Sequence, residues 1–129
     1  EILLIPLCGY TEGHAGVAVK TDQGWLLHAG NAYFFQGELN QDYNCPAGLR
    51  AYQKLMQVNR KMRVLNQIKL RDLSQEHHAD LRIFCSHDPT EFEDLKRADP
   101  RLLFSSNEAL NNILWMRPNH SNQSKNIPK

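Results

Sequence analysis

Three histidines lie where the chain is expected to enter or leave a β-strand, and imidazole is a side chain that binds metals and carries protons near neutral pH. His14 begins an apolar strand, His28 ends the next one, and His87 follows a third apolar run. Loops at strand ends carry functional residues more often than strand interiors do. A lone histidine is more often a hydrogen-bonded structural residue, and these spacings fit neither H-x-H nor H-E-x-x-H. The three histidines are therefore candidates for one site of undefined chemistry.

A second interpretation of the same residues is a cysteine nucleophile. Cys8 with His14 or His28 would resemble the thiol–imidazole pair of cysteine peptidases. Cys8 ends an apolar run, however, and buried cysteine is usually unreactive packing. The chain has only two further cysteines, Cys45 and Cys85, and no C-x-x-C pair. We therefore expect no disulfide framework and a reducing, cytoplasmic location.

Apolar runs predict the strands that must position these residues. Strands are expected at residues 2–8, 14–20, 25–28 and 81–85, and the first is apolar enough to be buried on both faces. Residues 21–24 are typical of a hairpin connection. Residues 33–46 indicate a loop with one short helical turn.

A long helical stretch is expected from residue 47 to residue 77, divided in two by a cap at Asn59. Apolar residues at three- and four-residue spacing predict its buried face: Tyr52, Leu55, Met56, Met62, Leu65, Ile68 and Leu73. Basic residues on the same stretch either bind nucleic acid or form a solvated face, and the second is the simpler interpretation: Lys54, Arg60, Lys61, Arg63, Lys69 and Arg71. Helices are also expected at 90–96 and near 102–115. We expect one domain over residues 1–115 and a polar, flexible tail over 116–129.

The composition is that of one globular domain. The 129 residues are 41% hydrophobic and carry a net charge of +1. This charge gives no general attraction to nucleic acid or to an anionic membrane, and no apolar run reaches the roughly 18–20 residues of a membrane span. We therefore expect neither a nucleic acid nor a membrane as partner.

Three segments together resemble the metallo-β-lactamase-fold hydrolases. Residues 9–14, Gly-Tyr-Thr-Glu-Gly-His, resemble the family's G-H-T-x-G-H segment, and residues 25–32 resemble its strand ending in G-D-A. Residues 84–89 resemble its last metal-binding loop. The resemblance covers about residues 2–93 and implies the second half of an αββα sandwich, an α/β (α+β) fold with a mixed sheet and helices on one face. Nothing in the chain matches the H-x-H-x-D-H motif of the family's first half.

The resemblance also implies a degenerate metal site. Of the three ligands that the family's second half supplies, only His87 is present, because Tyr10 stands at the position of a histidine and Asn31 at that of an aspartate. Zinc needs three or four good ligands, and a carboxamide is a poor one. His14 and His28 are expected to support the site. Asp88 either orients His87 or caps the following helix, and the cap is favoured.

Two functions follow from the resemblance. In the first, the chain is a fragment of a metal-dependent hydrolase of a small ester, lactone, thioester or amide, inactive alone, with zinc or no metal at all. In the second, it is a non-catalytic interaction or structural half-domain. A half without its counterpart would expose an apolar sheet face. A homodimer, the missing N-terminal half, or the segment 102–115 would cover that face.

Overall fold

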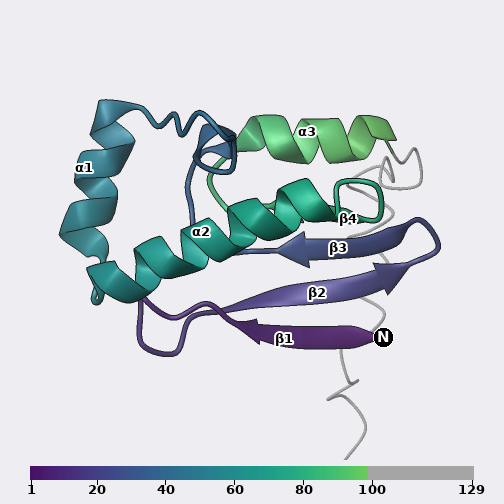
Figure 1. Ribbon diagram of the computed structural model, residues 1–129, viewed down its shortest axis with the longest axis horizontal. Helices are drawn as coiled ribbons and strands as arrows, with labels where there is room; N and C mark the ends of the chain where they lie inside the picture. Colours follow the sequence, from purple (N-terminus) through teal and green to yellow (C-terminus); the bar gives the residue numbers. More distant parts are fainter. Residues whose placement is uncertain (99–129) are drawn as a thin grey trace, which may run out of the picture. The chain divides into compact units, whose positions relative to one another are not determined.

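The computed structural model describes residues 1–98, which form a four-stranded sheet and the helices around it (Figure 1). The strands follow one another across the sheet in sequence order: β1 (Ile2–Pro6), β2 (Ala15–Thr21), β3 (Gly24–His28) and β4 (Leu81–Phe84). The chain divides into two units after Glu93, and the described part of the second unit is the end of helix α3 (Pro89–Ala98). The domain boundary expected at residue 115, the helix at 102–115 and the tail at 116–129 lie outside the described residues.

The expected hairpin joins β2 to β3. Thr21 pairs with Gly24 in the antiparallel register, and the hydroxyl of Thr21 donates a hydrogen bond to the carbonyl of Gly24 (2.9 Å). Gly24 has a φ of +116°, and a Cβ there would lie 2.2 Å from the carbonyl oxygen of Asp80. Glycine is therefore required at this turn, which also brings the hairpin against the start of β4.

The sheet is mixed, as expected. β1, β2 and β3 are antiparallel, whereas β4 runs parallel to β3. A parallel neighbour needs a long crossover. Here the crossover contains η1 (Gln36–Glu38), α1 (Ala47–Met56) and α2 (Arg60–Glu76). The α+β class predicted from the sequence is confirmed.

The long helical stretch is divided where the sequence predicts. The side-chain oxygen of Asn59 accepts a hydrogen bond from the backbone N–H of Met62 (3.0 Å), which caps α2. The backbone N–H groups of Val58 and Asn59 both donate to the carbonyl of Gly9. The interruption between α1 and α2 is thus anchored on the loop after β1.

The predicted buried face of these helices is wrong. The expected core residues of α1 and α2 are all exposed at their surfaces: Tyr52, Leu55, Met56, Met62, Leu65, Ile68 and Leu73. The buried residues of α2 are instead Arg63, Asn66, Gln67 and Leu70. Leu70 packs in the hydrophobic core with Leu7, Ala18 and Leu27 of the sheet side. The three polar residues instead make hydrogen bonds within the crossover and to the loop after β1.

The prediction that the basic residues form a solvated face is also wrong for two of them. Arg63 is only 7% exposed and Arg71 is half-buried, whereas Lys54, Arg60, Lys61 and Lys69 are exposed as expected. The guanidinium groups of Arg63 and Arg71 are satisfied by amide and carbonyl oxygens of the crossover.

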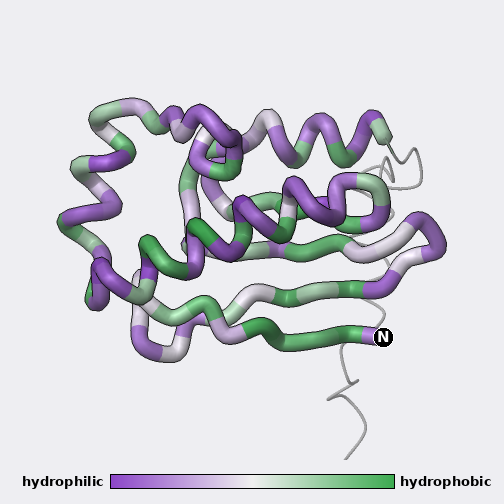
Figure 2. The backbone as a smooth tube through the Cα atoms, in the orientation of Figure 1, coloured by the Kyte–Doolittle hydropathy of each residue, from purple (hydrophilic) through white to green (hydrophobic). Residues whose placement is uncertain are grey.

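Within the described residues, the opposite face of the sheet is apolar and exposed. Leu3, Ile5 and Leu7 face α2, so alternation along β1 turns Ile2 and Leu4 to the other side. Ile2 is 69% and Leu4 73% exposed. Figure 2 shows β1 as hydrophobic along nearly its whole length. β1 ends at Pro6, short of the predicted residue 8. Contrary to expectation it is not buried on both faces, because no element within residues 1–98 covers the side that carries Ile2 and Leu4.

Within residues 1–98, no helix combines the length and the apolar composition that crossing a membrane requires.

Candidate functional site

Strand directions bring the predicted site residues to one edge of the sheet. β1 and β3 each run antiparallel to β2, and β4 runs parallel to β3. The carboxyl ends of β1, β3 and β4 therefore share one edge. The loops that follow them carry Tyr10, Asn31 and His87, while His14 precedes β2 and His28 ends β3. The structure thus places all five candidates at the same edge.

His14 is fully engaged in holding two loops together. Its Nδ1 lies 3.0 Å from the carbonyl oxygen of Leu7, and its Nε2 lies 2.9 Å from the backbone N–H of Asn31. A carbonyl only accepts and an N–H only donates, so Nδ1 carries the proton and Nε2 accepts. A Cβ on Gly30 would lie 2.6 Å from Nε2. His14 therefore positions the β1 and β3 loops, and neither of its nitrogens is available to a metal or to Cys8.

His87 pairs with the amide that stands at the second ligand position. Nε2 of His87 lies 2.9 Å from Oδ1 of Asn31. Because an amide oxygen accepts, Nε2 holds the proton in this arrangement and has no lone pair for a metal. The ring also lies on Phe34, with centroids 4.1 Å apart. An aspartate at residue 31 would instead offer a charged carboxylate at this point.

Tyr10 lies in an aromatic cluster rather than in a polar ligand set. Its ring contacts Phe34 (5.7 Å between centroids) and approaches His14 edge-on, and Phe34 also contacts Tyr52. Desolvation first, and then the neighbouring Tyr52 hydroxyl, raise the pKa of Tyr10 above its usual value. The phenol therefore stays neutral at physiological pH and is a poor ligand for a cation.

His28 and Ser86 line a separate hollow at this edge. Nε2 of His28 lies 3.3 Å from the hydroxyl oxygen of Ser86, and its ring contacts Phe84. Together with His87 and Phe92 they line a pocket of about 360 Å³. His28 therefore lines the same pocket as His87, which is hydrogen-bonded to Asn31.

Asp88 caps the helix that follows. One carboxylate oxygen accepts from the backbone N–H of Thr90 (2.9 Å) and the other from the backbone N–H of Gln36 (2.8 Å). The favoured cap is therefore present, and the second bond fastens the β4 loop to the start of η1. Glu91 makes a similar link, because it accepts from the Tyr33 hydroxyl (2.7 Å) and from the backbone N–H of Cys85 (2.8 Å).

Sequence reasoning missed the buried carboxylate of Glu38. It is 0% exposed, and it accepts hydrogen bonds from the backbone N–H of Phe34 and from the side-chain amides of Gln53 and Gln67. These bonds join the loop after β3 to both α1 and α2. An acidic residue three positions after Tyr-Phe-Phe was the available signal, and it is a weak one.

The three cysteines are free thiols, and two of them are buried. Burial raises the pKa of Cys45 to about 11 and that of Cys85 to about 12. Thiols with such pKa values are protonated at neutral pH and react slowly. Cys8 is half-exposed, contrary to the packing role expected for it.

The described residues do not fit a zinc ion. The edge offers a protonated Nε2, a neutral phenol and a carboxamide, and no group of three histidine, cysteine or carboxylate side chains within residues 1–98 could hold a metal. Zinc sites use three or four imidazole, thiolate or carboxylate ligands.

Comparison with known proteins identifies relatives for most of the chain. No family model matches it. Two proteins, from Mycobacterium bovis and Mycobacterium tuberculosis and both named probable metallo-hydrolase, are each 40% identical to it over 88 residues. The aligned region is 68% of this chain and 28% of each relative, so the chain spans less than a third of the length of these proteins. By this identity, the chain is a homologue of the probable metallo-hydrolases.

Proposed function

We propose that this chain is the counterpart of the second half of a metallo-β-lactamase-fold hydrolase, and that by itself it neither holds zinc nor hydrolyses substrates. The hydrogen bond between His87 and Asn31 carries the proposal, because it pairs Nε2 of the one remaining ligand with a neutral amide where the resembled family has a carboxylate. The homology to probable metallo-hydrolases supports the ancestral chemistry, metal-dependent hydrolysis of a small ester, lactone, thioester or amide.

The chain's own residues would then keep the shape of the site without its metal. His14, Asp88 and Glu91 bond backbone groups of neighbouring loops and hold the edge in place. None of these bonds depends on an ion. This arrangement explains how the edge remains ordered although two ligand positions are occupied by Tyr10 and Asn31.

Restoring the two ligand positions tests the proposal. The full chain and the double variant Tyr10→His/Asn31→Asp are expressed with zinc and without chelators, and their metal content is measured by plasma mass spectrometry. We expect well below one zinc per parent chain and a clear gain in the variant. A third protein that also carries His87→Ala should lose this gain. About one zinc per parent chain, lost on His87→Ala, would contradict the proposal.

A second candidate function is favoured by the open sheet face. Ile2 and Leu4 are the most exposed apolar residues of β1, and a large apolar patch usually marks a binding surface. A second copy of the chain is the proposed occupant, because the two halves of the resembled fold are related by an approximate two-fold axis. In this case the chain is a non-catalytic homodimer, and the free cysteines are consistent with a cytoplasmic location.

A further inference from the structure

A pocket rich in positive charge lies between α1 and α2, and no histidine is among the described residues that line it. Its volume is about 300 Å³, and five of its ten lining residues are cationic: Arg50, Lys54, Arg60, Arg63 and Arg71. No aspartate or glutamate is among the described residues that line it. One third of the chain's 15 lysines and arginines therefore gather in one pocket, although the whole chain carries a net charge of only +1.

Helical spacing explains how the pocket forms. On α2 the lining residues recur at three- and four-residue intervals from Arg60 through Arg63 and Gln67 to Arg71. On α1, Arg50 and Lys54 are separated by one turn. Residues at this spacing share one helix face. Both helices therefore place cationic side chains in one pocket, and an anion bound there would reduce the repulsion between them.

Two of the guanidinium groups are held in fixed positions by neutral oxygens. Nε of Arg63 donates to Oε1 of Gln57 (2.8 Å) and its NH1 to Oε1 of Gln53 (3.1 Å). Nε and NH2 of Arg71 donate to the backbone carbonyl of Glu38. Neutral acceptors fix the direction of a guanidinium without cancelling its charge. The buried carboxylate of Glu38 accepts hydrogen bonds from the pocket residues Gln53 and Gln67, and it offsets part of the positive charge of the five cationic residues.

An aromatic wall completes the pocket. The guanidinium of Arg71 lies over the Tyr43 ring, 5.4 Å from its centroid. This contact orients the arginine and leaves its charge in place. The site thus combines four arginines, one lysine and a tyrosine in a concave space.

We propose that this pocket binds the phosphoryl groups of a small phosphorylated molecule. Arginine forks match the oxygens of a phosphoryl group in pairs, and several of them together favour an anion with two or more charges over a carboxylate. The pocket's volume of about 300 Å³ and the low net charge of the chain favour a small molecule over an extended polyanion, which needs a long basic surface. The site is independent of the proposed loss of the metal ligands.

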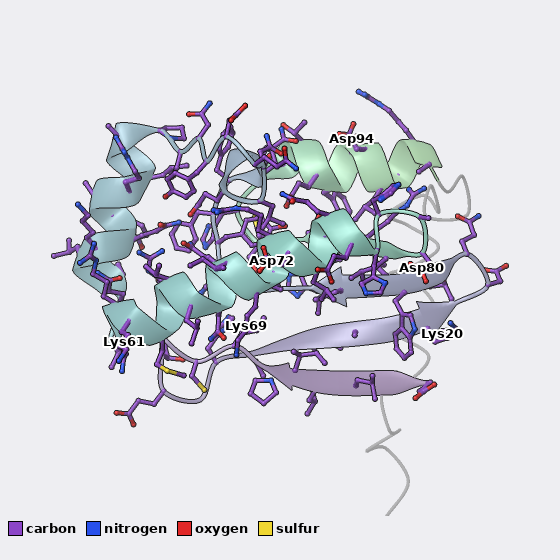
Figure 3. All side chains as sticks on the ribbon, viewed as in Figure 1. Lys20, Lys61, Lys69, Asp72, Asp80 and Asp94 are labelled. Carbon is purple, nitrogen blue, oxygen red and sulfur yellow. The ribbon has the colours of Figure 1, made fainter. Side chains whose placement is uncertain are left out.

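Calorimetric titration of the full chain with tripolyphosphate, at constant ionic strength, tests the proposal. The test variant is Lys54→Gln/Arg60→Gln, whose two residues are exposed and line the pocket. The matched control is Lys61→Gln/Lys69→Gln, with the same charge change on two exposed residues of α2 (labelled in Figure 3). Neither residue lines this pocket. We expect the test variant to bind about tenfold or more weakly and the control to bind as the parent does.

Three outcomes would overturn the proposal. The first is no binding of tripolyphosphate by the parent at millimolar concentration. The second is equal weakening in both variants, which would show diffuse attraction to positive charge. The third is tighter binding of single-stranded RNA or of phosphatidylserine vesicles than of tripolyphosphate, lost in the test variant, which would assign the pocket to a macromolecule or a membrane. Unchanged circular dichroism of both variants confirms that folding is preserved.

Discussion

Glu38 links the loop after β3 to both crossover helices. Its carboxylate is buried, and four donors reach it: the backbone N–H groups of Phe34 and Phe35 and the amides of Gln53 and Gln67. A buried carboxylate is tolerated where such bonds satisfy its oxygens. Through Phe34, which lies on the His87 ring, the same carboxylate fixes the aromatic side of the candidate site.

Removing this carboxylate should be costly. We expect Glu38→Ala to lower the free energy of unfolding by about 3 kcal/mol or more, because it leaves buried donors without an acceptor. Urea denaturation followed by circular dichroism measures the change. Glu12→Ala, in the exposed loop before His14, is the control and should change stability by less than about 0.5 kcal/mol. Equal stability of the two variants would contradict this role of Glu38.

The raised pKa values of the buried thiols predict slow alkylation near neutral pH. Because the pKa values of Cys45 and Cys85 are raised to about 11 and about 12, few of these thiols ionise at pH 8. Alkylation by iodoacetamide at pH 8 should therefore be at least about a hundredfold slower in the folded chain than in urea, where the thiol pKa is about 8.5. The half-exposed Cys8 is the internal reference. Mass spectrometry of the labelled peptides measures the rates, and rapid native labelling of Cys85 would contradict the prediction.

The same shifts determine how stability depends on pH. A thiol whose pKa is higher in the folded state than in the unfolded state makes its full contribution to the free energy of unfolding at pH values below its unfolded-state pKa. This contribution falls as the pH rises from about 8.5 towards the folded values near 11 and 12. Ionisation of Cys45 and Cys85 therefore lowers the free energy of unfolding only in alkaline solution.

At the scale of elements, the junction between α1 and α2 decides where the loop after β1 lies. Asn59 caps α2, and the backbone N–H groups of Val58 and Asn59 bond the Gly9 carbonyl. A Cβ on Gly9, whose φ is +136°, would lie 2.3 Å from the backbone nitrogen of Arg63. Tyr10 owes its place to this contact, since it directly follows Gly9.

The cap can be tested without disturbing the core. We expect Asn59→Ala to lower the free energy of unfolding by about 1 kcal/mol, because one backbone donor of the first turn of α2 loses its partner. Asn59→Asp should retain most of the stability, since its carboxylate accepts the same bond and complements the helix dipole. Asn40→Ala, at an exposed loop residue, is the control. An Asn59→Ala chain as stable as the parent in urea would show that the cap contributes nothing.

At the scale of the whole molecule, the described fold has one covered sheet face and one open face. Leu7, Ala18, Leu27 and Leu70 form part of the core between the sheet and α2. On the other side Ile2 and Leu4 are exposed, and alternation places Val17 and Val19 of β2 on the same face as Leu4. A continuous apolar face of this kind favours association.

Self-association through this face is a direct consequence of the homodimer proposal. We expect light scattering to give a dimer at micromolar concentration and Leu4→Lys to shift the chain to a monomer, because a charge on this face opposes its burial. Leu55→Lys is the matched control, since Leu55 is 80% exposed on α1 and lies outside the sheet. A stable monomer of the parent chain, or equal effects of the two variants, would contradict the homodimer.

The amino-acid sequence alone predicts the strands, the hairpin, the capped break at Asn59 and the grouping of the candidate histidines near strand ends. These features depend on local patterns: alternation, glycine at a tight turn and an amide at a helix start. The substitutions Tyr10 and Asn31 are also read from the sequence alone, because they are differences of residue type at positions that the resemblance defines.

The buried face of α2, in contrast, is apparent from the fold and not from the sequence pattern. Periodicity predicts burial of Leu65 and Ile68, but the crossover packs α2 through Arg63, Asn66, Gln67 and Leu70. The reason is the carboxylate of Glu38, which is distant in sequence and whose burial requires polar partners from both helices. The spacing of apolar residues indicates that a helix has an apolar side. Which side faces the core depends on the long-range hydrogen bonds that buried polar groups must make.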